Sequence, residues 1–313
     1  MTFFSVIIPL YNKANFIEST LESVLGQTFS DFEIVIIEDC STDNSFEIAA
    51  KTNDPKIRII RHEKNKGLSA SRNTGIENSN SKYLCFLDAD DEWQPHYLAK
   101  IHSLIQQFPE ARLFATNYAE QYETKSVLPA SSLHGFEKDG IIPDFFASNL
   151  YQHIYCCCSL CVDKQVFEEI GLYDEHITFG EDVDFNIRAN SVFRLAYSKE
   201  APVLVNVFSE NQITNSKLSN KRLVDLDKYE TLASKNPSLK KYLDTNRYVL
   251  AKLFLLENDV AKARKISSAI APENLNFTQK LLLKLPVPVL RSIRRTKVFF
   301  VKKGIRFTSF GSI

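Results

Sequence analysis

Three carboxylates stand within four positions at the end of an apolar segment. Asp88, Asp90 and Asp91 follow residues 83–87, whose composition is typical of a buried strand. Asp88 and Asp90 should therefore emerge at the C-terminal edge of that strand, where carboxylates can hold a hard divalent cation and the phosphates that it carries. The same cluster could instead solvate a loop or cap the next helix, so its context must decide.

A second acidic group follows Gly180. Val183 and Ile187 lie four residues apart and predict a helix, with Glu181 and Asp182 in its first turn. Carboxylates at this position could face a site next to the glycine. They could equally be first-turn acids that the helix dipole favours.

The elements that would position these groups come from the first 110 residues, where strand and helix patterns alternate. Four β–α units predict a mostly parallel sheet with right-handed crossovers and helices on both faces. Ligands of such sheets bind beyond the C-terminal ends of the strands, and Pro9, Tyr11 and Asp39 fall at that edge together with Asp88 and Asp90. The expected strands cover residues 4–10, 32–37, 57–60 and 83–87, and the expected helices cover residues 15–27, 41–50, 68–78 and 96–108.

The length of 313 residues allows a core of about 200 to 250 residues and an appendage. Residues 1–215 are expected to form one α/β domain. Residues 216–313 are rich in helix formers with few Gly or Pro, which predicts a helical C-terminal extension.

Charge is unevenly placed along the chain. Basic and acidic residues number 38 each, but nine Lys or Arg and no acid stand in residues 274–313, leaving 29 basic against 38 acidic residues before them. Residues 278–306 mix bulky apolar side chains with spaced cations, which predicts a basic amphipathic segment at a membrane interface. The alternative is a basic helix that packs on the acidic main domain. Nucleic acid is not an expected partner, because aromatic residues are too sparse here for a stacking platform.

The location of the protein follows from two absences in the sequence. No apolar run reaches the roughly 18 to 20 residues of a membrane-spanning helix, and the first residues form neither a basic leader nor a small-residue cleavage site. We therefore expect a cytoplasmic protein, peripheral at the inner face of the cell membrane.

Four cysteines cluster at Cys156, Cys157, Cys158 and Cys161. The C-x-x-C spacing would need a second ligand pair to make a zinc site, and the sequence offers none. Because their neighbours are apolar and aromatic, these residues are interpreted as small core residues of a strand, with a redox or metal role as the alternative.

Several motifs in a fixed order make the chain resemble a family-2 glycosyltransferase of the GT-A fold, of the kind that builds bacterial surface polysaccharides. The resemblance covers about residues 3 to 200. No single motif is specific, but their order and spacing together are. They are SVIIPLYN at 5–12, LGQT at 25–28, FEIVIIED at 32–39, GLSASRNTG at 67–75, LDADD at 87–91 and GED at 180–182.

The resemblance implies a nucleotide-binding half in about residues 1–110. Matched by position, Pro9, Tyr11 and Asp39 would surround the base, with Asp39 accepting from its imide nitrogen. Arg72 would line the diphosphate and Asp88 would reach the ribose. The acceptor would bind to a second half in about residues 111–215.

The implied reaction uses two further carboxylates. Asp90 would bind Mn²⁺ or Mg²⁺, and Asp182 would be the general base, with Glu181 and Asp91 as supporting groups. The enzyme would be inverting and would move a single sugar from a nucleotide-sugar donor, a UDP-sugar, to a glycan or lipid-linked acceptor. Only one tryptophan, Trp93, is present, so the Gln-x-x-Arg-Trp motif of processive relatives is missing.

The chain departs from the family pattern where a further metal contact is expected. Residues 205–212 lack the histidine that often follows in relatives. Two other functions stay open: a sugar-phosphate nucleotidyltransferase, for which an early Gly-rich loop with basic residues is missing, and a catalytically silent nucleotide-binding protein.

Overall fold

The computed structural model describes residues 2–122, 127–129 (backbone only), 136, 138–210, 212 and 216–302. Residues 303–306 of the predicted basic segment lie outside this described part.

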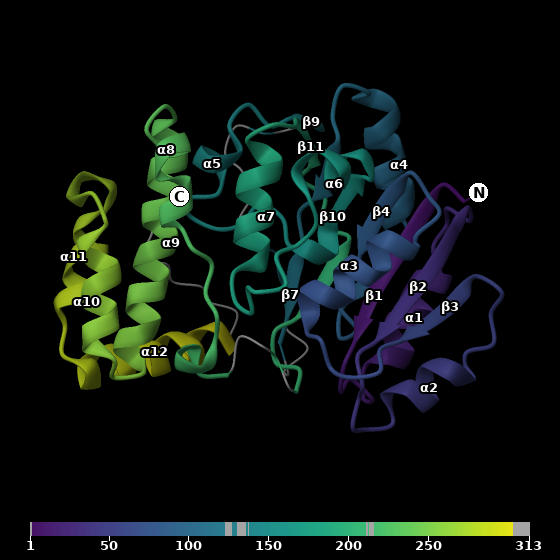
Figure 1. The fold of residues 1–313 in the computed structure, drawn as a ribbon, viewed down its shortest axis with the longest axis horizontal. Coiled ribbons are helices and arrows are strands. Elements are labelled where there is room, and N and C mark those ends of the chain that lie inside the picture. Colours follow the sequence, from purple (N-terminus) through teal and green to yellow (C-terminus); the bar gives the residue numbers. More distant parts are fainter. Residues whose placement is uncertain are drawn as a thin grey trace.

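An eight-stranded sheet forms the centre of the molecule (Figure 1), in the order β3-β2-β1-β4-β10-β6-β11-β9. The first four strands in that order are parallel, β10 runs antiparallel between β4 and β6, and β11 is again parallel to β6. The strands are β1 (Phe4–Leu10), β2 (Phe32–Glu38), β3 (Ile57–Arg61), β4 (Tyr83–Phe86), β6 (Leu113–Thr116), β9 (Gly140–Ile141), β10 (Leu160–Asp163) and β11 (Leu195–Ser198).

Alternating side chains of β1 enter two different cores. Val6 and Ile8 pack on one face of the sheet and Ile7 on the other, as the two-residue period of a strand requires. Helices α1 (Ile17–Leu25), α2 (Ser45–Lys51) and α4 (Tyr97–Gln107) cover the first face. Helices α3 (Leu68–Asn78), α6 (Gln165–Ile170) and α7 (Glu181–Asn190) cover the second. Both faces are buried, which explains the continuous apolar runs of these strands.

A smaller four-stranded sheet, in the order β5-β12-β7-β8, lies beside the C-terminal edge of the large one. Its strands are β5 (Glu92–Trp93), β7 (Ala119–Gln121), β8 (Val127–Pro129) and β12 (Val203–Asn206). Residues 92–93 pair with β12 and do not begin a helix, so Asp91 is not a helix cap. This pairing brings residues 206–210 next to the acidic cluster.

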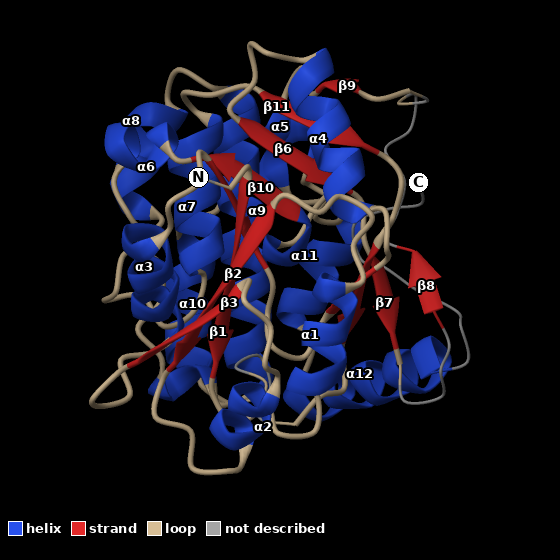
Figure 2. Cartoon of the chain, turned by 90° about the vertical axis from the view of Figure 1, so that its right-hand side faces the viewer, coloured by secondary structure: helices blue, strands red, loops and turns tan. Residues whose placement is uncertain are grey.

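The C-terminal region is helical (Figure 2), and its buried side chains belong to the second core. Helix α9 (Pro237–Leu256) has Tyr242 against Phe145 and Phe146 of α5 (Phe145–Ser148), with ring centroids 6.0 and 5.5 Å apart. This packing confirms the predicted α/β fold with a helical extension, while the division at residue 215 stays a prediction. The helices are α8 (Glu230–Ala233), α9 (Pro237–Leu256), α10 (Val260–Ser268), α11 (Phe277–Lys284) and α12 (Val287–Lys302).

Candidate active site

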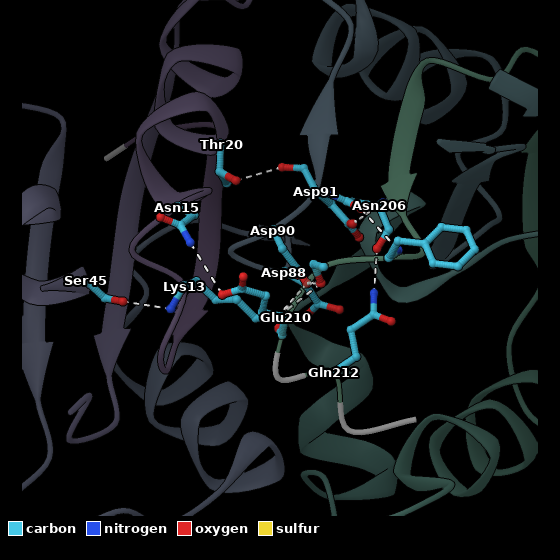
Figure 3. Close-up of polar contacts among 12 residues, drawn as sticks. Lys13, Asn15, Thr20, Ser45, Asp88, Asp90, Asp91, Asn206, Glu210 and Gln212 are labelled. Atoms are coloured by element: carbon cyan, nitrogen blue, oxygen red, sulfur yellow. Dashed lines mark hydrogen bonds and ion pairs between the residues drawn. The ribbon is translucent and has the colours of Figure 1, made fainter. Parts of the chain in front are cut away.

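The three carboxylates after β4 have different partners, and Figure 3 shows the residues around Asp90 and Asp91. Strand β4 continues its pairing with β1 through the bond from the Leu87 amide to the Ile7 carbonyl, and the Asp91 amide then donates to the Asp88 carbonyl at 3.0 Å. This turn separates the side chains, and Asp88 is the most open of them, with its side chain 37 % exposed. The predicted emergence of Asp88 and Asp90 at the strand's C-terminal edge is confirmed.

Asp90 forms an ion pair with the side chain of Lys13. The ammonium of Lys13 lies 2.7 Å from Asp90 Oδ2, and both side chains are nearly buried, at 12 and 11 % exposure. Lys13 also donates to the Glu210 carbonyl at 2.7 Å and to Ser209 Oγ at 3.2 Å, and the Ser209 hydroxyl donates to Asp90. The ammonium thus has three oxygen partners, which come from two distant segments.

Asp91 is buried between strands rather than open to a ligand. Its oxygens accept from the Cys158 thiol at 2.9 Å and from the Asn206 amide at 2.8 Å. Burial, and then repulsion from Asp90 and Asp88, raises the pKa of Asp91 well above its ordinary value.

The sequence predicts that the four clustered cysteines are small core residues of a strand, and this is confirmed for Cys161 in β10. Cys158 is also buried in the core, but it is not in a strand. It lies in a short 3₁₀ helix, Cys157–Ser159, immediately before β10. Its sulfur contacts Asp91 and accepts from the Asp88 amide at 3.3 Å. Ligand atoms of Asp88, Asp91 and Cys158 all lie within 4.8 Å of one another. The thiol therefore supports the acidic turn.

Arg72 joins Asp88 and Glu181, which lie 93 positions apart in the sequence. Its Nη2 donates to Asp88 Oδ1 at 3.2 Å and its Nη1 donates to Glu181 Oε1 at 3.1 Å. The guanidinium is 3 % exposed and lies over the ring of Tyr173 at 5.4 Å. A planar fork can hold two carboxylates in fixed directions, so Arg72 keeps Asp88 and Glu181 close together.

Helix α3 carries Arg72 to this place because of its glycines. Gly67 precedes the helix at φ 90°, a conformation that side chains disfavour. A Cβ at Gly75 would come within 2.3 Å of Ile7 Cγ2, so the helix packs on β1 at a distance that only glycine allows. Ser69 Oγ then donates to the Ile177 carbonyl, which ties α3 to the segment before α7.

Glu181 and Asp182 begin α7 after Gly180, which adopts a left-handed conformation with φ 86°. Asp182 is exposed, and one of its oxygens accepts from the Val183 amide at 2.8 Å. Burial, and then the neighbouring Asp182, raises the pKa of Glu181 against the opposing effect of Arg72. The exposed Asp182 carboxylate is accessible to a substrate, while the half-buried Glu181 carboxylate is bound by Arg72.

The predicted base-binding residues fall at the C-terminal edge of β1 and β2. Pro9 is half-buried, and Tyr11, just beyond β1, is 43 % exposed.

Asp39 is the most enclosed of these residues. Its side chain is 4 % exposed, lies 2.7 Å from His62 Nδ1, and accepts from the amides of Lys66 and Gly67 at 2.8 Å. Asp39 thus fixes the loop before α3, and a base imide would have to share its oxygens.

The donor set of the acidic turn suits a hard divalent cation. Asp88 and Asp90 offer carboxylate oxygens, which Mg²⁺ and Mn²⁺ prefer, and Asp90 is already paired with a positive group. Asp88 and Asp90 would hold the ion once Lys13 moves away. The segment that lacks the expected histidine supplies Ser209 to Asp90 instead.

Sequence reasoning missed Lys13, His62 and Ser209, and it named Cys158 without its contact to Asp91. Lys13 follows the PLYN motif at the end of β1, where its position could have marked it as a residue of the site. Ser209 lies 119 positions from Asp90, and no local pattern could have found that contact.

Comparison with known families identifies the family of the chain. Residues 5–171 match the family model described as glycosyl transferase family 2. The chain belongs to this family. Family membership agrees with the order of the motifs around Asp39, Arg72 and Asp88, all of which lie inside the matched region.

Individual relatives and solved structures are also similar to the chain. Among curated proteins of Bacillus subtilis (strain 168), the uncharacterized glycosyltransferase EpsJ is 31 % identical over 194 residues, 59 % of this chain and 55 % of that protein. The putative teichuronic acid biosynthesis glycosyltransferase TuaG is 39 % identical over 98 residues, 31 % of this chain and 39 % of that protein. The matched part spans only 28 to 55 % of several such relatives.

The fold is also that of S. aureus TarS. Residues 1–349 of TarS in complex with UDP-GlcNAc align with a TM-score of 0.64 at 18 % identity, over 94 % of this chain and 92 % of that one. At this identity the likeness shows the fold alone. The mostly parallel sheet with a helical C-terminal region is therefore shared by both chains.

Proposed function

We propose that this family-2 glycosyltransferase is metal-dependent and inverting, and that it moves one sugar from a UDP-sugar to a glycan or lipid-linked acceptor in surface-polysaccharide biosynthesis. One observation carries the proposal: Arg72 bridges Asp88 and Glu181. Asp88, which is expected to contact the donor, and Glu181, next to the expected base Asp182, are thereby held close together. TuaG, named for teichuronic acid biosynthesis, and the UDP complexes of TarS support the polymer class and the donor class.

On the donor side, Asp88 is open enough to accept from a ribose hydroxyl, and Asp90 would hold Mn²⁺ or Mg²⁺ together with it. When bound, the cation would stabilise the negative charge that develops on the departing nucleoside diphosphate. Pro9, Tyr11 and Asp39 would receive the base beyond β1 and β2.

On the acceptor side, Asp182 would take the proton of the attacking hydroxyl. An alcohol is a weak nucleophile near neutral pH, so a positioned carboxylate contributes about 10²- to 10⁴-fold. Asp182 is exposed at the start of α7, while its neighbour Glu181 is held in place by Arg72. One base and one displacement, with no carboxylate forming a covalent bond to the sugar, would invert the anomeric centre.

A donor screen tests this function. Free UDP is measured after incubation with each of a panel of UDP-sugars, in the presence of Mn²⁺ and of an extract of bacterial cell envelopes as the source of acceptor. One UDP-sugar should be preferred. The Asp182→Asn variant should lose about 10²-fold or more of that turnover while it still binds UDP. Equal turnover by the wild type and this variant would contradict the role of Asp182.

A further inference from the structure

The first residues of the helical C-terminal region run back to the start of α7. Residues 222–224 lie beside residues 178–180, which immediately precede that helix. The amides of Thr178 and Phe179 donate to the Arg222 carbonyl at 2.8 and 3.3 Å. The Arg222 amide in turn donates to Thr178 Oγ1 at 2.9 Å. These bonds fix the backbone that leads into α7.

Val224 packs against the glycine that precedes α7. A Cβ at Gly180 would come within 2.8 Å of Val224 Cγ1, so the two residues are in direct contact. Val224 is buried, and its amide donates to the Phe179 carbonyl at 3.1 Å. Gly180 holds the left-handed φ of 86° that turns the chain into the helix. The conformation of Gly180 therefore sets the direction of the first turn, which carries Asp182.

A second attachment lies two residues beyond Asp182. The Tyr229 hydroxyl donates to Asp184 Oδ1 at 2.6 Å, and Lys228 Nζ lies 2.5 Å from the same oxygen. The Asp184 side chain is buried, so these bonds are shielded from water. Residues 222–229 thus hold α7 both before and after Asp182.

This segment is attached in turn to the rest of the helical C-terminal region. The side chain of Glu257, the residue after α9, accepts from the amides of Leu218 and Ser219, the latter at 3.1 Å. Among the described residues, neither this region nor the rest of the chain has a helix that is long and apolar enough to cross a membrane. The contacts of residues 218–229 connect the end of α9 to the start of α7.

We infer that Val224 is a positioning residue that holds Asp182 in the direction from which it takes the proton of the acceptor. The inference rests on the proposed function, in which Asp182 is the general base. A shorter side chain at position 224 would leave space beside Gly180, and the first turn of α7 could then shift. A displacement of about 1 Å at a reacting group can lower the rate about 10²-fold. Asp88 and Asp90 follow β4, so UDP binding should be spared.

Steady-state kinetics of Val224→Ala test the inference on the full chain. With the preferred UDP-sugar and Mn²⁺, kcat should fall about tenfold or more, while the KM for the UDP-sugar and the Kd of UDP should change less than about twofold. Gly180→Ala is the second variant, because its Cβ would press on Val224 without opening a cavity, and it should show the same split. In the double variant, the loss of kcat should be smaller than the product of the single losses by about threefold or more, as expected for residues in contact.

The control is Val166→Ala, which shortens a buried valine of α6 in the same core. It should lower the urea midpoint as Val224→Ala does and leave kcat unchanged. A wild-type kcat in Val224→Ala, an equal loss of kcat in Val166→Ala, a parallel loss of UDP binding, or independent effects in the double variant would overturn the inference.

Asp182→Asn separates this inference from the proposed function. Full activity of Asp182→Asn would contradict the role of Asp182 itself. Full activity of Val224→Ala beside an impaired Asp182→Asn would contradict only the positioning role of Val224.

Discussion

The ammonium of Lys13 lies 2.7 Å from Asp90 Oδ2, where the sequence predicts a divalent cation. Two oxygens from residues 209 and 210 complete its surroundings. A divalent ion and this ammonium would compete for the same carboxylate, because both neutralise it at close range. The free energy of metal binding at Asp90 would therefore include the cost of displacing Lys13.

Replacing Lys13 with methionine should tighten metal binding. We expect the Kd of Mn²⁺, measured by calorimetry without nucleotide, to fall about tenfold, since the competing charge is removed and Asp90 is left unpaired. Lys64→Met, at an exposed lysine after β3, is the matched control and should bind Mn²⁺ as the wild type does. Unchanged or weaker binding by Lys13→Met would show that the ammonium does not compete with metal.

Arg72 cannot be replaced by lysine without loss. A single ammonium lacks the fork that reaches both Asp88 and Glu181, so Arg72→Lys should lower kcat about 10²-fold and the unfolding free energy by about 1 to 3 kcal/mol. Denaturant unfolding and UDP release measure the two effects. Arg58→Lys, at a more exposed arginine, should change neither; a fully active Arg72→Lys would refute the bridging role.

Asp184 gives the fold a defined pH dependence. It is 1 % exposed and bonds Arg188 at 2.8 Å, Lys228 at 2.5 Å and Tyr229 at 2.6 Å. Although burial raises the pKa of Asp184, these partners together lower it below its ordinary value. The native state thus favours the charged form of Asp184. The stabilisation of the fold by this charged group is therefore fully present above the unfolded pKa of about 3.9, and it is lost as pH falls through the lower folded pKa.

Asp184→Asn should therefore cost about 1.5 to 3 kcal/mol of unfolding free energy at neutral pH, because the charged hydrogen bonds of this buried carboxylate to Arg188 and Lys228 are lost. The difference from the wild type should shrink as pH falls below about 4. Urea unfolding across this range measures it, with Asp31→Asn, at an exposed aspartate, as the control. A deficit of the same size at every pH would show that charge is not the cause.

Much of the fold could be predicted because its signals are local. Apolar runs marked β1, β2 and β4, and glycines marked the starts of α3 and α7. The two-residue strand at Glu92–Trp93 could not be predicted, since its pairing partner β12 lies more than 100 positions away. The helix expected from residue 15 begins at Ile17, and no side-chain cap starts it.

The candidate site was predictable to the extent that each residue belongs to a motif. Asp88, Asp90, Glu181 and Asp182 stand at element ends, and local pattern places them there. Their partners are nonlocal: Lys13 is 77 positions from Asp90. Such contacts depend on how loops that are distant in the sequence are arranged around the C-terminal edge of the sheet. Sequence periodicity does not encode this arrangement.

The most direct test of the account is UDP binding with and without Mn²⁺, measured by calorimetry on the wild type and on Asp90→Asn. We predict that Mn²⁺ strengthens UDP binding by the wild type about tenfold or more, within the usual range of coupling between two ligands, and that this gain disappears in Asp90→Asn. Equal UDP affinity with and without Mn²⁺ in the wild type, or the same gain in both proteins, would contradict a metal-held diphosphate at Asp90.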